Sequence, residues 1–179
     1  MIVGVVEGVA STVLLVSGPS SVGKTSFARA LSARLVQPFL LIEADRFLPD
    51  PPARGWQSLT LDHTGRVRTG LYAAVAAFAA AGNDLIVDGL LPTDATAKAD
   101  CINQLRRHAH LIVLGLSASE RTLDDRERAR NDRAPGTASA QRMLAHDGLS
   151  YDIELGTNDD SPDALAAIAI ERLLAFGVR

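Results

Sequence analysis

The chain has 179 residues, of which 47% are hydrophobic, and this length fits one globular domain with a substantial core. A formal net charge of −3 argues against a main role in neutralising a nucleic-acid backbone or an anionic membrane surface, so we expect neither as a partner. The one cysteine, Cys101, can form neither an internal disulfide nor a multi-cysteine metal cage, which is typical of a reducing compartment.

Neither the N-terminus nor the longest apolar run predicts a membrane segment. No basic residue precedes Lys24, so the N-terminus lacks the charged start of a secretory signal. The longest apolar run, Leu71 to Ala81, is shorter than the roughly 20 residues that span a bilayer. We expect a cytoplasmic protein, and the sequence leaves its oligomeric state open.

Short apolar runs alternate along the chain with longer alanine-rich stretches. The runs are Ser11 to Val16, Phe39 to Ile42, Asp84 to Val87, Leu111 to Leu116 and Tyr151 to Leu155. Because the middle runs are apolar almost throughout, we expect strands that are buried on both faces of a parallel sheet. The stretches between them carry apolar residues every four positions, such as Phe27, Leu31 and Leu35, which predicts helices. The pattern predicts an α/β three-layer fold with a five-stranded parallel sheet flanked by helices.

Two segments interrupt this alternation. Residues 46–70 are rich in proline and glycine and predict a substrate-binding insertion, with a possible hairpin that runs from Ser58 to Asp62, turns, and returns over Arg66 to Arg68. Residues 121–136 are dense in arginine and end in Pro135-Gly136, which predicts a mobile lid. No repeat or linker indicates a second domain, so we treat residues 1–179 as one domain.

The segment Gly18-Pro19-Ser20-Ser21-Val22-Gly23-Lys24-Thr25 matches the phosphate-binding loop pattern and lies between a predicted strand and a predicted helix. Glycine lets the backbone curl so that successive N–H groups point at a phosphate, and the helix N-terminus adds partial positive charge. We expect Lys24 to reach the terminal phosphates and the Thr25 hydroxyl to hold Mg²⁺. The nucleotide contacts predicted in this segment are Gly18, Ser20, Ser21, Val22, Gly23, Lys24, Thr25 and Ser26.

Carboxylates follow two of the predicted strands. Strand alternation would place Glu43 and Asp45 on the same side, beside the phosphate loop, where Asp45 can accept the proton of an attacking hydroxyl. Asp88 ends the run from Leu85 and can act on Mg²⁺ through water or on the attacking group, so we pair it with Thr25 as a metal contact. A solvated carboxylate that caps the strand is the alternative reading of each position.

The lid segment carries arginines that fit phosphoryl transfer. On a helix Arg126 and Arg130 share a face and Arg133 follows three residues on, so their guanidinium groups can bind the nucleotide and stabilise the transferring phosphoryl group. We expect Arg121 and Arg128 to pair instead with the nearby acidic residues. The segment Gly156 to Asp159, with Thr157, lies where nucleotide kinases commonly seat the adenine. No Asn-Lys-x-Asp guanine motif occurs, which favours ATP over a GTP switch.

Together these residues resemble the chloramphenicol phosphotransferase family of P-loop kinases. The resemblance runs from about Thr12 over almost all of the chain. The matching stretches are Gly18 to Ser26, Ala44-Asp45, Leu61 to Val67, Ala81 to Asp88, Arg126 to Arg133, and His146 to Asp152 with Thr157.

The resemblance implies an ATP-dependent O-phosphotransferase with a nucleotide-kinase-like fold and a lid. Residue by residue, it implies that Lys24 and Thr25 contact phosphate and Mg²⁺, that Asp45 activates a primary hydroxyl, and that Arg130 and Arg133 are lid arginines. The chain departs from the family pattern where it has Asp88-Gly89 instead of two acidic residues, where Glu43 replaces a small residue, and over Phe47 to Trp56. These departures concern the acceptor pocket more than the reaction.

The acceptor is therefore open at this point. An apolar pocket would suit an aromatic or macrocyclic alcohol, although ordinary core packing explains its residues equally well; they are Phe47, Leu48, Trp56, Leu90 and Leu91. A carboxylate at Glu43 would instead recognise an amine. The leading hypothesis is a kinase that inactivates an antibiotic such as chloramphenicol. The alternatives are a nucleoside, sugar or nucleotide-sugar kinase of the toxin type, and a non-catalytic ATP-binding regulator.

Overall fold

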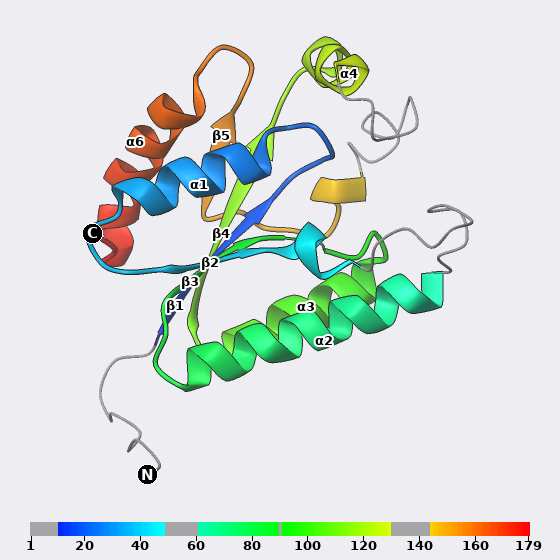
Figure 1. Cartoon of the computed structure of the whole chain (residues 1–179), viewed down its shortest axis with the longest axis vertical. Coiled ribbons are helices and arrows are strands. Elements are labelled where there is room, and N and C mark those ends of the chain that lie inside the picture. Colours follow the sequence, from blue (N-terminus) through cyan, green and yellow to red (C-terminus); the bar gives the residue numbers. More distant parts are fainter. Residues whose placement is uncertain (1–10, 49–60, 90, 130–143) are drawn as a thin grey trace.

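The computed structural model describes residues 11–48, 61–89, 91–129 and 144–179. In chain order the elements are β1 (Thr12–Ser17), α1 (Lys24–Arg34), β2 (Leu40–Glu43), the 3₁₀ helix η1 (Ala44–Phe47), α2 (Leu61–Ala80), β3 (Leu85–Asp88), α3 (Ala95–Arg106), β4 (His110–Ser117), α4 (Glu120–Arg128), β5 (Ile153–Gly156), α6 (Pro162–Leu173) and the 3₁₀ helix η3 (Leu174–Phe176). Figure 1 shows the sheet between two layers of helices, with α4 beyond the end of β4.

The five described strands form one sheet in the order β2-β3-β1-β4-β5, and all four neighbouring pairs are parallel. Each strand overlaps its predicted run, with ends shifted by one or two residues. The prediction of a five-stranded parallel sheet flanked by helices is therefore confirmed. Because β1 lies in the centre, the loop that follows it emerges in the middle of the sheet edge where the carboxyl ends of all strands meet.

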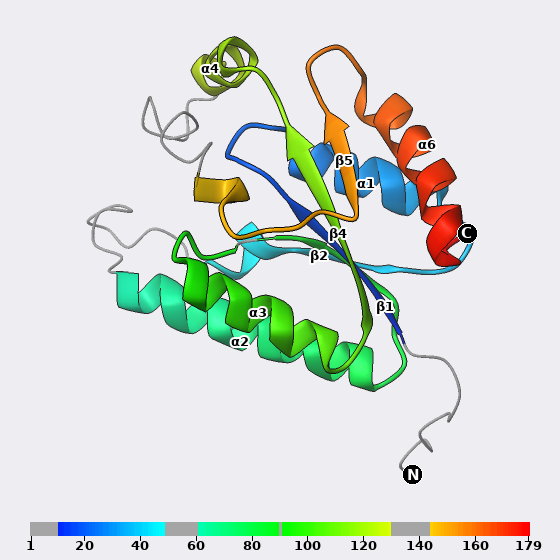
Figure 2. The same cartoon turned by 180° about the vertical axis from the view of Figure 1, so that it is seen from behind.

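Side chains of the central strand alternate between two apolar clusters. Val13 and Leu15 pack with α2 and α3, whereas Leu14 and Val16 pack with α1 and α6. Figure 2 shows α2 and α3 together on one face and α1 with α6 on the other. All four side chains are fully buried, and each contributes about 1.5–3 kcal/mol to the free energy of folding. Burial on both faces explains why the strand sequences are apolar throughout.

The hairpin predicted over Ser58 to Arg68 is wrong for its described part. Residues 61–80 form one helix, α2, which spans the segment that was expected to turn. The turn prediction relied on Gly65 and its polar neighbours, but the burial of Leu71 and Val75 against the sheet outweighs the weak helix propensity of a glycine. Residues 49–60, which hold the rest of the predicted insertion, lie outside the described part of the chain.

The last helix begins and ends as its sequence indicates. The Ser161 side chain accepts a hydrogen bond from the Ala164 amide at 3.2 Å, and Pro162 occupies the first helical position. Gly177 follows η3 with a φ of 79°. Among the described residues, no helix is both long enough and apolar enough to cross a lipid bilayer.

Candidate active site

The phosphate-loop segment leaves the centre of the sheet and requires glycine at its first position. Gly18 has a φ of +151°, and a Cβ atom there would lie 2.5 Å from the carbonyl oxygen of Leu116 in β4. Gly23, with a φ of +101°, immediately precedes α1. Any other residue would strain the backbone at these two positions, so the glycines of the motif shape the loop directly.

The N-terminus of α1 provides a setting for anionic phosphate. No side chain caps this helix and its first turn, Lys24 to Phe27, contains no acidic residue. The Lys24 ammonium donates hydrogen bonds to the carbonyl oxygens of Gly18 and Pro19 at 3.0 and 2.9 Å, so it lies across the loop. The Ser21 hydroxyl is buried and has no hydrogen-bond partner among the described residues. These donors fit the phosphates of a nucleotide.

The Thr25 hydroxyl and the Asp88 carboxylate meet between α1 and the end of β3. Thr25 Oγ1 donates a hydrogen bond to Asp88 Oδ2 at 2.5 Å. Burial raises the pKa of the Asp88 carboxyl. The hydrogen bond from Thr25 and the charge of Lys24 lower this pKa and so oppose the effect of burial. No group of three potential metal-ligating side chains occurs within the described ranges. A hydroxyl and a carboxylate nevertheless fit Mg²⁺, which takes one or two protein oxygens and completes its shell with water and phosphate.

Asp45 lies at the same sheet edge, but a 3₁₀ helix places it there instead of the predicted strand. Strand β2 ends at Glu43, and Asp45 is exposed on η1, so strand alternation does not place the two carboxylates together. The helix η1 packs on α2 through Ala44, which is buried with Leu71 and Tyr72. Glu43 pairs with Asp88 in the register of β2 and β3, and Asp45 follows two residues later, so the three carboxylates belong to the same edge of the sheet. The charges of Asp45 and Glu43 add to the effect of burial in raising the pKa of Asp88.

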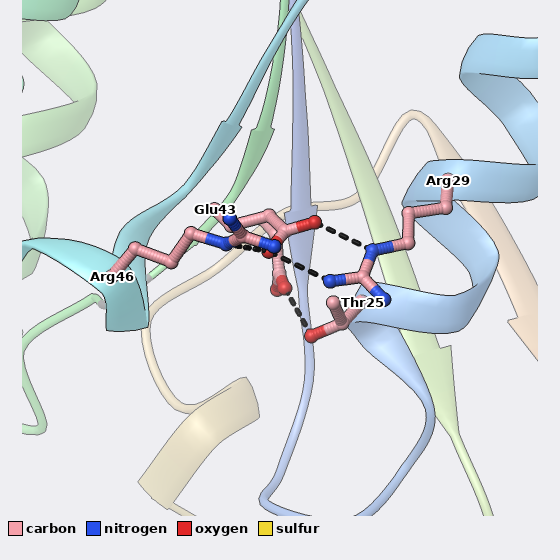
Figure 3. A network of polar contacts seen from close by, with 5 residues as sticks. Thr25, Arg29, Glu43 and Arg46 are labelled. Carbon is pink, nitrogen blue, oxygen red and sulfur yellow. Dashed lines mark hydrogen bonds and ion pairs between the residues drawn. The ribbon is translucent and has the colours of Figure 1, made fainter.

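Glu43 is held between two arginines from different elements (Figure 3). Its Oε1 accepts a hydrogen bond from Arg29 Nε of α1 at 2.6 Å, and its Oε2 accepts from Arg29 Nη2 at 2.9 Å and from Arg46 Nε of η1 at 2.5 Å. The bond from Arg29, reinforced by Arg46, lowers the pKa of Glu43 to about 2. An amine would have to displace a bidentate guanidinium, so the arrangement gives Glu43 the role of fastening η1 to α1 instead of recognising a substrate.

Arg126 and Thr157 are joined to the phosphate loop. The guanidinium of Arg126 donates to the Val22 carbonyl oxygen at 3.1 Å, to Thr157 Oγ1 at 2.9 Å and to the Thr157 carbonyl oxygen. Thr157 Oγ1 in turn donates to the same Val22 oxygen at 2.9 Å, and its side chain is buried. The structure therefore brings together α4, the end of β5 and the phosphate loop, and the predicted contacts of Arg126 and Thr157 with the nucleotide stay a prediction.

The remaining arginines of the predicted lid divide into two groups. Arg128 forms an ion pair with Asp125 at 2.8 Å and Arg121 lies 4.0 Å from the same carboxylate, which confirms their predicted pairing with nearby acidic residues. Arg130 and Arg133 lie outside the described residues, so their role as lid arginines stays a prediction. The same holds for the lid beyond α4.

The proposed apolar acceptor pocket is described only in part. Leu91 packs against the cluster beneath α2 and α3, while Phe47 is half exposed on η1; Trp56 and Leu90 lie outside the described residues. Where the family pattern has a second acidic residue, Gly89 follows Asp88. A Cβ atom at Gly89 would lie 3.1 Å from the Val16 carbonyl oxygen, so a side chain fits there only if its neighbours shift.

Two polar residues on α2 that no sequence motif indicated, Arg68 and Tyr72, border this region. Tyr72 is fully buried and its hydroxyl has no hydrogen-bond partner within the described ranges; the same is true of the buried Nε of Arg68. The two residues are four positions apart and so lie on one face of the helix. The expectation of a hairpin concealed this spacing, which is the signal that identifies them.

Lys98, which no sequence motif indicated, is almost fully buried on α3. Its ammonium donates hydrogen bonds to the carbonyl oxygens of Leu144 at 2.7 Å and Asp147 at 2.5 Å. Burial lowers the pKa of Lys98. This lysine fastens the chain after residue 143 to the helical layer formed by α2 and α3.

Solved structures with a similar fold are kinases and a resistance protein. APS kinase CysC from Mycobacterium tuberculosis in complex with AMPPNP and APS has a TM-score of 0.67 and 16% identity, with 93% of this chain and 99% of that chain covered. A gluconokinase from Sinorhizobium meliloti has a TM-score of 0.66 and 18% identity, with coverage of 94% and 95%. The tunicamycin resistance protein from Deinococcus radiodurans has a TM-score of 0.60 and 16% identity, with coverage of 94% and 97%. At these identities the likeness shows a shared P-loop kinase fold.

No curated protein matches the chain. The family described as chloramphenicol phosphotransferase-like protein matches residues 11–174, nearly the whole chain and all of the site described above. This protein therefore belongs to the chloramphenicol phosphotransferase-like family, and it is an ATP-dependent phosphotransferase.

Proposed function

We propose that this protein transfers the terminal phosphate of ATP to a hydroxyl of a small molecule, that the acceptor is an antibiotic such as chloramphenicol or a related alcohol, and that Asp45 is the general base. One observation carries the proposal. Glu43 and Asp88 are neighbours in the register of β2 and β3, Asp45 follows two residues later, and Asp88 accepts a hydrogen bond from Thr25 of α1 at 2.5 Å.

In the proposed reaction the acceptor oxygen attacks the terminal phosphorus atom. Its proton passes to the Asp45 carboxylate, the bond from phosphorus to the bridging oxygen breaks, and the electron pair leaves with ADP. Lys24 neutralises charge on the phosphate oxygens, and Arg130 and Arg133 would do so from the lid. Mg²⁺ would supply further charge neutralisation, held by the Thr25 hydroxyl and by Asp88 directly or through water.

The positions of the acidic residues support separate roles. Asp88 is buried and accepts a hydrogen bond from Thr25. It is therefore better placed to hold the metal than to receive a proton from the substrate hydroxyl. Asp45 is exposed on η1, where an acceptor in solution can reach it. The Glu43 bridge between Arg29 and Arg46 fastens η1 on both sides of Ala44 and Asp45, which holds the proposed base in position.

The test is a mass-spectrometric screen of the purified protein with ATP and Mg²⁺ for the mass gain of one phosphoryl group. The acceptors are amphenicols, macrolides, aminoglycosides, nucleosides and nucleotide sugars. We expect an amphenicol to gain the group, and we expect Asp45→Asn to lower the rate about 10³-fold while leaving ATP affinity within twofold, because a positioned base contributes on this order.

Glu171→Gln is the matched control, since Glu171 is an exposed carboxylate on α6, on the opposite face of the sheet from α2. Phosphorylation of a nucleotide sugar or nucleoside alone would replace the antibiotic assignment with that of a toxin-type kinase. Equal transfer rates in the wild type and Asp45→Asn would remove Asp45 as the base.

A further inference from the structure

Helix α2 presents two buried polar groups to the acceptor side of the sheet without giving them a partner. The Tyr72 hydroxyl and the Arg68 Nε are inaccessible to solvent, and neither forms a hydrogen bond within the described part of the chain. A buried donor that is left unsatisfied costs about 1–3 kcal/mol of stability. Two such groups one turn apart therefore mark a place where a ligand could supply the partners that the described residues lack.

The two groups lie beside the proposed catalytic carboxylates. A Cβ atom built on Gly89, the residue after Asp88, would lie 3.5 Å from the Tyr72 hydroxyl. Tyr72 is also buried in the same cluster as Ala44, the neighbour of Asp45. Arg68 lies one helical turn before Tyr72 on α2, so the guanidinium and the phenol share one face of this helix. A ligand bound to Arg68 and Tyr72 would thus adjoin the site of phosphoryl transfer.

The chemistry of the two groups selects an anionic oxygen ligand. Arg68 forms no ion pair within the described ranges, and the groups it influences are the Tyr72 phenol and the Cys101 thiol, neither of which supplies a counter-charge. A guanidinium offers a planar fork of donors that matches the two oxygens of a carboxylate, and the phenol adds a third donor. A neutral apolar group would leave all of these donors unsatisfied.

We propose that Arg68 and Tyr72 bind a carboxylate of the acceptor molecule and thereby select alcohols that carry one. This inference rests on the function proposed above and narrows its acceptor class. Neutral chloramphenicol would then be a poorer acceptor than a hydroxy acid of similar shape. Arg68 and Tyr72 are specificity residues here, since the proton transfer and the phosphate contacts belong to other side chains.

The test compares matched alcohols: 4-(hydroxymethyl)benzoate, its amide 4-(hydroxymethyl)benzamide, 4-nitrobenzyl alcohol and chloramphenicol. For the wild type we expect kcat/KM to be at least tenfold higher for the carboxylate than for the three neutral alcohols. Arg68→Gln should raise the KM for the carboxylate at least tenfold, with the KM for ATP unchanged, because hydrogen bonds to a charged group are worth more than tenfold in affinity. Arg68→Lys should restore part of the loss.

Two further variants separate recognition from structure. Tyr72→Phe should raise the KM for the carboxylate about threefold to fivefold while its Tm stays equal or rises, because the substitution removes an unsatisfied hydroxyl. A lower Tm with an unchanged KM would mean a structural hydroxyl. Arg66→Gln is the matched control, since Arg66 is exposed on the same helix, and its kinetics should equal those of the wild type.

Calorimetry with 4-(hydroxymethyl)benzoate in the presence of MgADP separates this proposal from the enzymatic one. Binding that is lost in Arg68→Gln, without phosphorylation of any acceptor, would support the carboxylate site and overturn the proposed function. Phosphorylation of neutral alcohols at equal rates in the wild type and Arg68→Gln would overturn the carboxylate site and leave the function standing. Absence of both binding and phosphorylation would overturn both.

Discussion

The two halves of the sheet edge are built differently. On the proposed nucleotide side, polar groups around the phosphate loop form hydrogen bonds with one another. The examples are Arg126, Thr157 and the Val22 carbonyl oxygen. On the acceptor side, buried groups of Arg68 and Tyr72 have no partner among the described residues. Within the described residues, the proposed nucleotide side is largely completed by hydrogen bonds of the chain itself, whereas on the proposed acceptor side two polar groups stay open to a ligand. Ser21, buried in the phosphate loop without a partner, is the exception that a phosphate would satisfy.

The largest loss of stability and of ATP binding should come from a substitution that strains the backbone of the phosphate loop. In Gly18→Ala the new Cβ would lie 2.5 Å from a carbonyl oxygen at a φ of +151°, so we expect a loss of about 3 kcal/mol in the free energy of unfolding and no measurable ATP binding. Urea unfolding and calorimetry with MgATP measure the two effects. Gly65→Ala is the matched control, because a Cβ at Gly65 has no neighbour within 4 Å. The control should gain about 0.5–1 kcal/mol from better helix propensity, and equal losses in both variants would contradict the account.

A smaller effect should separate the two halves kinetically. Arg126→Met removes three hydrogen bonds to Val22 and Thr157, so we expect the KM for ATP to rise about tenfold while the KM for the acceptor changes less than twofold. Steady-state kinetics with each substrate varied in turn gives both values. Arg121→Met is the control, since Arg121 is exposed and lies 4.0 Å from its acidic neighbour. A parallel rise in both KM values would show that the halves are not independent.

The smallest effect concerns Glu43, which joins η1 to α1. Its pKa is lowered to about 2 in the folded chain, so the stability it contributes is fully present above pH 4.5 and is lost as the pH falls towards 2. We expect Glu43→Gln to be less stable than the wild type by about 1 kcal/mol at pH 7, with the difference vanishing near pH 2. Urea unfolding from pH 2 to pH 7 measures how the difference in the free energy of unfolding between the wild type and Glu43→Gln depends on pH. Glu171→Gln is the control. A difference that does not depend on pH would mean that the carboxylate charge is not the cause.

Sequence patterns predicted the sheet and the position of the phosphate-loop segment because their determinants are local. The phosphate loop is a contiguous motif, and the continuous apolar runs predicted the strands because both faces of the sheet are buried. Arg126 and Thr157 are hydrogen-bonded to the phosphate-loop segment, while their predicted contact with the nucleotide stays a prediction.

The acceptor half was harder to predict because its determinants depend on tertiary packing. The glycine at position 65 suggested a turn, yet the four-residue spacing of Val67, Leu71 and Val75 carries the helix through it. The alternation argument for Asp45 failed because β2 ends at Glu43 and a 3₁₀ helix follows. No local pattern indicates that the Tyr72 hydroxyl is unpartnered, because that depends on which groups the fold brings near it.

Two charged side chains, Arg126 and Lys98, fix described parts of the chain and so affect the conformational entropy of the protein. Arg126 binds the phosphate loop, and the buried Lys98 holds the carbonyl oxygens of Leu144 and Asp147. Fixing parts of the chain in this way loses conformational entropy when the protein folds. That part of the conformational entropy is then not lost again when substrates bind, so these two fixed points favour tighter binding at the sheet edge.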